Sequence, residues 1–229
     1  MGSKVKQESR RWFGRTIPYI IDDSVNNLRK FIEGNITTPG AIQIIQMQTH
    51  LRFVNRTNQS DYISFVNGQE CSSKIGRQGG AQRVNLNKDT CDSSGVVVHE
   101  IAHAIGMFHE QSRLDRDQFV NVHWENIEKG KEHNFEKYGS NEGSEYGLYD
   151  FSSVMHYTRC TFGRAGYYWT SGWTTVLNYA MSGAQYLFFP KASGFGSDGN
   201  NGSTTTGVWE LVSPRTSGPK AGPRSSPIE

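Results

Sequence analysis

The sequence lacks both a strong net charge and a long run of apolar residues. Its 229 residues include 24 basic and 22 acidic side chains, so the formal net charge is only +2, and the mean hydropathy is −0.62. A nearly balanced charge gives no indication of a nucleic-acid-binding surface. No apolar stretch approaches the about 20 residues that span a bilayer. The length and the 25 glycines indicate one substantial core, or two lobes around a cleft, with many loops.

The chain has only three cysteines, and no secretory signal is recognisable at its start. Residues 1–7 are polar, and Lys6 stands where an N-myristoylation signal needs Ser or Thr. Cys71 and Cys91 enclose a glycine-containing segment, which predicts a disulfide of the kind formed in oxidising compartments. Such a bridge stabilises by roughly 3 kcal/mol; two buried free thiols are the alternative. Cys160 is left as an unpaired third cysteine.

Apolar periodicity predicts a sheet and two helices in the first half of the chain. Four strands are expected, at residues 16–22, 51–54, 61–66 and 83–86. Pro18 favours an edge position for the first of them. One helix is expected over 41–50, and a second is expected to begin after Ser93 or Ser94, either of which can cap it. A weakly amphipathic helix is predicted over 126–138.

The second of these helices contains the most informative motif, HEIAHAIGMFH, which begins at His99. Histidines four residues apart lie on one face of a helix, so His99 and His103 can bind the same metal ion. Glu100 is placed to reach a water on that ion. His109 is out of helical register, and Gly106 permits the turn that brings it back, because glycine adopts positive φ without steric cost.

A bare HExxH also occurs by chance on amphipathic helices, with its Glu and His simply solvated. The added glycine and third histidine argue against that alternative. About fifty residues later, Ser153-Val-Met-His-Tyr157 places Met155 and Tyr157 two residues apart. Taken alone, this pentapeptide is ordinary core sequence. After the long histidine motif it indicates a packed floor beneath the ligands and a phenol that can reach the ion or the substrate.

These motifs together resemble the astacin family of metzincin zinc endopeptidases. The similarity includes the zinc motif as far as Asp117, the turn at 149–157, an entry segment with Trp12 and Ile17-Pro-Tyr19, and the loop that starts at Cys71. It covers residues from about 10 to about 162. The resemblance implies an α+β, metzincin-type, two-lobed fold. That fold has a twisted mixed sheet, two long helices above the cleft and a mostly irregular lower lobe.

The resemblance also implies roles for the site residues. His99, His103 and His109 are expected to bind one catalytic Zn²⁺, with Tyr157 as a displaceable extra ligand and oxyanion donor. Glu100 is expected to be the general base that activates a zinc-bound water for hydrolysis of peptide bonds. The structural residues implied are Met155, Glu110, Cys71 and Cys91.

Glu110 matches a residue that contacts the amino terminus of mature family members, and a plain surface carboxylate is the alternative for it. For Arg113, Asp115, Arg116 and Asp117, which match a structural charge cluster of the family, we favour a solvated or structural ion-pair network.

The domain organisation expected is a flexible segment at 1–11, a catalytic domain at 12–162 with its upper lobe ending near 106, and a tail at 163–229. The tail matches nothing in the family and is expected to be poorly ordered. Expected partners are protein or peptide substrates, without nucleic acid or membrane, and a secreted monomer is predicted. The alternative is an inactive zinc-binding or interaction protein with a damaged lower lobe.

Overall fold

The computed structural model describes residues 2–164 and 169–171. All of them belong to the first of the two units into which the chain divides, Met1–Phe189. Most of the predicted tail therefore lies outside the described residues. Among the helices that are described, none is long and apolar enough to cross a bilayer.

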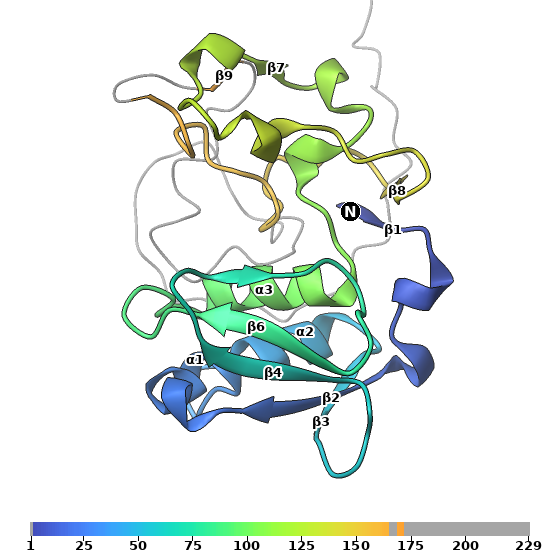
Figure 1. Ribbon diagram of the computed structural model, residues 1–229, viewed down its shortest axis with the longest axis vertical. Helices are drawn as coiled ribbons and strands as arrows, with labels where there is room; N and C mark the ends of the chain where they lie inside the picture. Colours follow the sequence, from blue (N-terminus) through green and yellow to red (C-terminus); the bar gives the residue numbers. More distant parts are fainter. Residues whose placement is uncertain (1, 165–168, 172–229) are drawn as a thin grey trace, which may run out of the picture. The chain divides into compact units, whose positions relative to one another are not determined.

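A five-stranded sheet with the order β3-β2-β4-β6-β5 forms the first part of the chain (Figure 1). All neighbours pair in parallel except β5, which is antiparallel to β6 at one edge. The strands are β2 (Thr16–Ile21), β3 (Arg52–Asn55), β4 (Tyr62–Asn67), β5 (Ser72–Ser73) and β6 (Ala81–Leu86). The mixed sheet confirms the prediction, and each expected strand is present to within a few residues.

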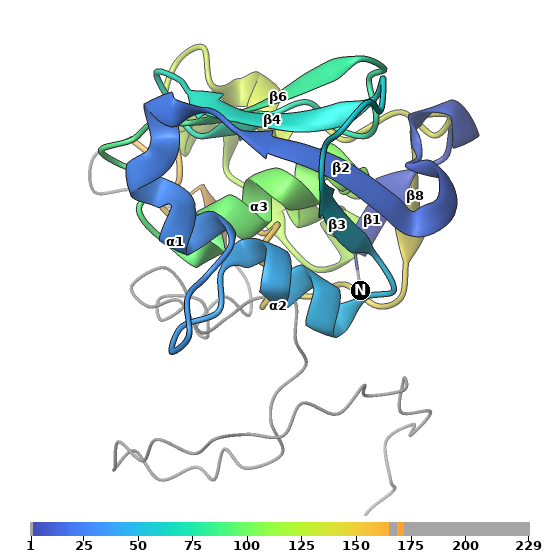
Figure 2. The same ribbon diagram turned by 90° about the horizontal axis from the view of Figure 1, so that it is seen from below.

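Three α-helices lie on one face of this sheet (Figure 2). They are α1 (Arg29–Ile32), α2 (Ala41–Gln48) and α3 (Ser94–Ile105). Two long helices were expected. Helix α3 has 12 residues, whereas α2 is present but has only 8. Apolar side chains of the sheet and helices form one buried core, with Ile63, Phe65 and Ile101 fully inaccessible. This core holds α3 rigidly against the sheet.

Helix α3 begins and ends as the sequence predicts. The Ser93 hydroxyl accepts a hydrogen bond from the Val96 amide, which satisfies one of the free donors of the first turn. At the other end Gly106 has φ of 111°, and a Cβ there would lie 2.8 Å from a methyl carbon of Val5. Glycine is therefore required both by the left-handed backbone and by the close approach of the N-terminal segment.

The remaining elements are short. The strands are β1 (Gly2–Val5), β7 (Asn121–Val122), β8 (Gly143–Tyr146) and β9 (Thr170–Ser171). The 3-10 turns are η1 (Glu8–Arg10), η2 (Phe13–Arg15), η3 (Asp23–Leu28), η4 (Glu110–Ser112), η5 (Arg116–Gln118), η6 (Trp124–Asn126) and η7 (Glu132–Phe135). After α3 no α-helix occurs in the described residues, so the prediction of a mostly irregular second lobe is confirmed.

Two predictions about secondary structure are wrong. Strand β2 is interior rather than an edge strand. Pro18 is tolerated because its nitrogen faces β4, whose pairing with β2 begins only at Tyr19, so no ladder hydrogen bond is lost. The helix expected over 126–138 is absent. Gly130 has φ of 87°, which interrupts a segment with little apolar periodicity and leaves only 3-10 turns on either side.

The expected boundaries at both ends of the catalytic region also differ from the structure. Residues 2–5, expected to be flexible, form β1 and pair antiparallel with β8, and Gly2 and Ser3 are buried. Trp169, which falls within the expected divergent tail, is fully buried against Ile127 and Phe135. Local composition predicted disorder in both segments. The backbone pairing of β1 orders the first, and the burial of the Trp169 indole orders the second.

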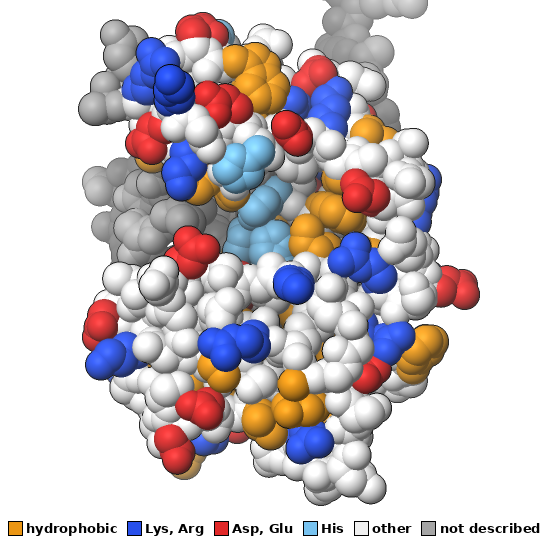
Figure 3. All heavy atoms as spheres, viewed as in Figure 1, with side chains coloured by type: hydrophobic (Ala, Val, Ile, Leu, Met, Phe, Trp, Pro, Cys, Tyr) orange, Lys and Arg blue, Asp and Glu red, His pale blue; other side chains and the backbone are white. Residues whose placement is uncertain are grey.

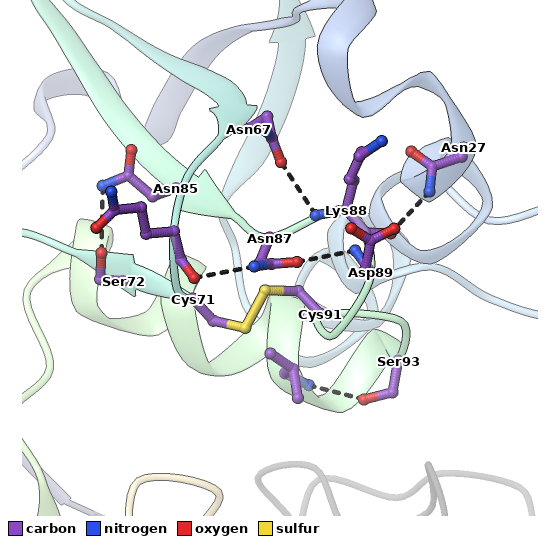
Figure 4. Close-up of a disulfide and its surroundings, with 12 residues drawn as sticks. Asn27, Asn67, Cys71, Ser72, Asn85, Asn87, Lys88, Asp89, Cys91 and Ser93 are labelled. Atoms are coloured by element: carbon purple, nitrogen blue, oxygen red, sulfur yellow. Dashed lines mark hydrogen bonds between the residues drawn. A yellow bond between two sulfur atoms is a disulfide. The ribbon is translucent and has the colours of Figure 1, made fainter.

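The predicted disulfide is present between Cys71, just before β5, and Cys91, after β6 (Figure 4). The bridge closes a segment with a sequence separation of 20 residues. Around it Asn87 donates to the carbonyl of Gln69 and accepts from the Asp89 amide. The loop beside the edge strand is thus held both covalently and by hydrogen bonds. Cys160 is free and exposed.

Candidate metal centre

The three motif histidines converge on one point. His99 and His103 are one turn apart on α3, and the turn at Gly106 returns the chain so that His109 faces them. The Nε2 atoms of His103 and His109 are 3.1 Å apart, and those of His109 and His99 are 3.2 Å apart. Histidine side chains gather at the surface of this face of the molecule in Figure 3.

These separations fit a tetrahedral zinc ion. Zinc–nitrogen bonds of about 2.0–2.1 Å at tetrahedral angles place neighbouring nitrogens about 3.3 Å apart. Three uncharged ring nitrogens at this spacing, with no acidic ligand among them, form the donor set of zinc sites that keep a fourth position open. The residues present therefore fit a single Zn²⁺.

Hydrogen bonds orient the two helical rings. The Nδ1 atom of His99 lies 2.8 Å from the carbonyl oxygen of Val154, and that of His103 lies 2.8 Å from the carbonyl oxygen of Met107. A carbonyl only accepts, so each Nδ1 carries the proton and each Nε2 presents its lone pair to the shared point. Burial lowers the pKa of all three histidines, which keeps the rings neutral and able to bind a metal.

Glu100 lies beside the first ligand and is only 5 % exposed. Its Oε2 atom is buried without a hydrogen-bond partner among the described residues. Burial, and secondarily the charge of Glu70, raises the pKa of this carboxyl to about 8. A buried carboxylate oxygen without a partner is costly unless a ligand or water meets it. The carboxyl group is therefore available to a molecule bound at the histidines, and a cation bound there would lower its pKa again, so that it is ionised and can act as a base.

The second motif, residues 153–157, contacts two of the histidines and the residue after the third. Met155 is fully buried, and its carbonyl accepts from the amide of Glu110, directly after the third histidine. The ring of Tyr157 lies 4.4 Å from the ring of His109, measured between centroids. Burial, and then the charge of Glu100, raises the pKa of Tyr157 to about 12. The phenol thus stays protonated close to both groups.

Two residues that sequence reasoning missed hold the main chain of Tyr157. The Gln111 side chain accepts from the Tyr157 amide at 3.0 Å, and Nδ1 of His156 donates to the Tyr157 carbonyl at 2.7 Å. Nε2 of His156 in turn accepts from the Tyr149 hydroxyl at 2.7 Å. Both side chains are buried, so they hold the main chain of Tyr157 in place on either side of its Cα atom. Nothing in the sequence distinguishes these contacts from ordinary core polarity.

The predicted ion-pair network is present, but it is more buried than a surface network. Glu110 is 0 % and Arg113 1 % exposed, and they are joined at 3.0 Å. Arg113 also pairs with Asp115 at 2.8 Å. Glu110 is therefore not a plain surface carboxylate. Its Oε1 accepts from the Asp150 amide as well, and a Cβ on Gly2 would lie 3.7 Å from its Oε2. Arg116 and Lys137 both pair with Asp117.

The features of the metzincin-type zinc peptidase fold are all present: a mixed sheet, a helix with two histidines one turn apart, a glycine turn to a third histidine, and a later turn with a buried methionine that bonds to the residue after that histidine. The model of the astacin peptidase family matches residues 4–179, and the chain belongs to this family. The match begins earlier and ends later than the residues 10–162 expected from the motifs. Its extension agrees with the paired β1 and the buried Trp169.

Curated relatives agree with the family. High choriolytic enzyme 2 of Oryzias latipes is 41 % identical over 147 residues, which is 64 % of this chain and 50 % of that protein. Zinc metalloproteinase nas-6 of Caenorhabditis elegans is 34 % identical over 183 residues, covering 77 % of this chain and 51 % of that protein. This chain thus spans about half the length of these relatives.

Solved structures agree with the fold. High choriolytic enzyme 1 of Oryzias latipes, a hatching enzyme zinc-protease, superposes with a TM-score of 0.65 at 35 % identity, covering 74 % of this chain and 84 % of that chain. Myroilysin shares the fold with a TM-score of 0.52 at 20 % identity, covering 78 % and 94 % of the two chains. The predicted family and fold class are confirmed.

Proposed function

We propose that this chain is a zinc-dependent endopeptidase that hydrolyses peptide bonds of proteins. The observation that carries the proposal is the convergence of three neutral imidazole Nε2 atoms beside the buried, unpartnered Oε2 of Glu100. A donor set for one metal ion and a free carboxylate next to it are what hydrolysis by an activated water requires. Membership of the astacin family supports the same reaction.

His99, His103 and His109 would hold the zinc ion. When bound, the ion supplies a Lewis acid for the substrate carbonyl and lowers the pKa of a water to about 7. The chain orients the ligands through the carbonyls of Val154 and Met107, which fix the tautomer of two rings. Ring orientation is thus set before any ligand arrives.

Glu100 moves the proton. Its Oε2 accepts a proton from the attacking water as the new carbon–oxygen bond forms at the peptide carbonyl. The same oxygen then donates that proton to the amide nitrogen, which leaves as an amine when the carbon–nitrogen bond breaks. The burial of Glu100 leaves no other described group to compete for this oxygen.

Tyr157 donates a hydrogen bond to the oxyanion that develops on the carbonyl. Its side chain contacts the rings of His109 and Phe135, while its main chain is held by Gln111 and His156. This arrangement anchors the backbone and leaves the phenol as the part that can move. The resemblance to the family supports a second role for it, as a displaceable zinc ligand.

The substrates proposed are proteins or peptides, and the chain is proposed to act outside the cell. The Cys71–Cys91 disulfide supports an oxidising compartment. A monomeric state and the absence of nucleic-acid and membrane partners stay predictions.

The proposal is tested with Glu100→Gln, using Glu136→Gln at an exposed position as the matched control. We expect Glu100→Gln to retain one zinc per chain by metal analysis while kcat on a denatured protein falls by about 10²–10⁴-fold. Tyr157→Phe should also retain zinc and lose about 10²-fold in kcat. Activity in the unchanged chain must be abolished by a zinc chelator.

The outcomes separate the two functions considered. Substantial activity in Glu100→Gln would show that another group is the base. Stoichiometric zinc in the unchanged chain without chelator-sensitive cleavage would favour the inactive zinc-binding protein instead.

A further inference from the structure

Three Asn-X-Ser/Thr patterns lie within the described residues. They are Asn35-Ile-Thr37, Asn55-Arg-Thr57 and Asn58-Gln-Ser60. The pattern is the acceptor for N-linked glycans in proteins that pass through the secretory pathway, but it occurs often by chance. The structure distinguishes the three by what their amides and hydroxyls contact.

In the first pattern the Thr37 hydroxyl already contacts the side-chain carboxamide of Asn35. The Oδ1 atom of Asn35 accepts from the Thr37 amide at 2.9 Å, from the Thr37 hydroxyl at 3.0 Å and from the Thr38 amide at 2.7 Å. Its Nδ2 has no partner in the described part of the chain. The carboxamide is thus held by its oxygen, and its nitrogen is left accessible.

The side chains around Asn35 are exposed, and among the described residues their hydrogen bonds stay within the turn itself. Residues 35–39 are all exposed, and Ile36 is fully so, at 103 % of its reference area. The segment connects α1 to α2 and projects from them as a loop in Figure 2. Backbone pairing of Gly34 with Pro39 closes the loop. A bulky group on Asn35 therefore meets none of the described helices or strands, and it can cover the exposed isoleucine.

The other two patterns use their hydroxyls elsewhere. The Thr57 hydroxyl contacts the Oδ1 of Asn58, at 3.4 Å, rather than Asn55, and Asn55 itself pairs with Tyr19 in the sheet register. The Ser60 side chain hydrogen-bonds Asp61. In neither pattern do the hydroxyl and the carboxamide of the same pattern meet.

We propose that Asn35 carries an N-linked glycan, an inference that rests on the proposed extracellular location. The donor is a lipid-linked diphosphate oligosaccharide. The Nδ2 of Asn35 forms a bond to the anomeric carbon of the first sugar and loses one proton to the transferase. The bond from that carbon to the diphosphate breaks, and the lipid diphosphate leaves with the electron pair.

The turn at Asn35 can form before the rest of the fold. Every hydrogen bond in it joins residues two or three apart, and such local turns of Asn need no tertiary support. The acceptor geometry is therefore accessible while the chain is still unfolded. In the folded protein the same turn remains on the surface.

The test uses the full chain, directed into the secretory pathway of cultured animal cells by an added signal peptide. Peptide-N-glycosidase converts a glycan-bearing Asn to Asp, and trypsin separates the three asparagines onto residues 31–52, 53–56 and 57–74. We expect Asp at position 35 by mass spectrometry. Asn35→Gln and Thr37→Ala should remove this modification, while Thr37→Ser should keep it.

Matched controls are Asn55→Gln and Asn58→Gln, which should leave the modification at Asn35 unchanged. Unmodified Asn35 in secreted chains whose Cys71–Cys91 bridge has formed would overturn the proposal, as would modification of Asn55 or Asn58 in its place. Chelator-sensitive cleavage is measured on the same material. A glycosylated but inactive chain contradicts the peptidase function alone.

Discussion

The two regions that meet at the histidines are stabilised in different ways. Residues 16–106 form a mixed, mostly parallel sheet with helices on one face, and their interior is an apolar core that includes Phe65 and Ile101. Residues 110–164 have only short turns and strands. Their interior contains the buried Arg113 and Arg116, which bond to carboxylates and main-chain carbonyls.

The difference explains what each region contributes to the site. A helix packed on a sheet holds two ligands at a fixed separation, because its backbone hydrogen bonds and its apolar face leave little freedom. The irregular region presents backbone carbonyls and a phenol at positions that no regular helix or strand would place there, such as the Val154 carbonyl on His99 and the ring of Tyr157 on His109. Damage to the first region should therefore affect stability, and damage to the second should also affect catalysis.

The largest expected effects compare two fully buried phenylalanines. Phe65→Ala and Phe135→Ala should each lower the free energy of unfolding by about 3–5 kcal/mol, since each loses apolar burial and leaves a cavity. Chemical denaturation measures the loss. Because Phe135 contacts Tyr157, only Phe135→Ala should also lower kcat of the folded enzyme. Equal kcat values in the two variants would contradict the division between the regions.

Removing the buried cation should be nearly as damaging. Arg113→Met leaves the Glu110 carboxylate buried and unpaired, and we expect a loss of about 3–5 kcal/mol of stability. Glu110→Gln in the same chain neutralises that charge and keeps an acceptor for the Asp150 amide. The double variant should therefore unfold at higher denaturant than Arg113→Met. A double variant no more stable than the single one would show that the ion pair is not what stabilises this region.

A smaller effect is expected at the start of the ligand helix. Ser93→Ala removes the hydroxyl that accepts from the Val96 amide, which should cost about 1 kcal/mol in chemical denaturation. Ser93→Asp retains an acceptor and is the control. Because the apolar face of α3 stays packed, zinc content should not change. Loss of zinc in Ser93→Ala would mean that packing alone does not hold the ligands in place.

The smallest effect concerns pH. The Gly80 amide and Arg77 bond to Asp61 and lower the pKa of its carboxyl. A pKa lower in the folded than in the unfolded state contributes stability above the unfolded value of about 3.9, and that stability is lost as the pH falls through the folded value. The contribution is at most about 1 kcal/mol for a pair that is only partly buried. Asp61→Asn should flatten the acid side of the stability curve, measured by thermal unfolding between pH 6 and 3; an unchanged slope would contradict the assignment.

Features determined by neighbouring residues were predictable from the sequence. The pairing of His99 and His103, the cap at Ser93 and the turn at Gly106 all depend on contacts within a few residues of each other. The strands were predictable because burial of one face leaves an alternation along the strand, and in β4 and β6 every second residue is buried. The interior position of β2 was not predictable, because it depends on which other strands pair with it.

The sequence alone determined the chemistry of this protein: three imidazoles, a carboxylate and a glycine at spacings that a helix and one turn convert into a zinc site. Tertiary structure decided how that chemistry is held. The Gln111 bond to Tyr157 spans 46 residues, the Val154 bond to His99 spans 55, and β1 near the start of the chain pairs with the distant β8. Such contacts are set by which segments the folded core brings together, and no local spacing encodes them.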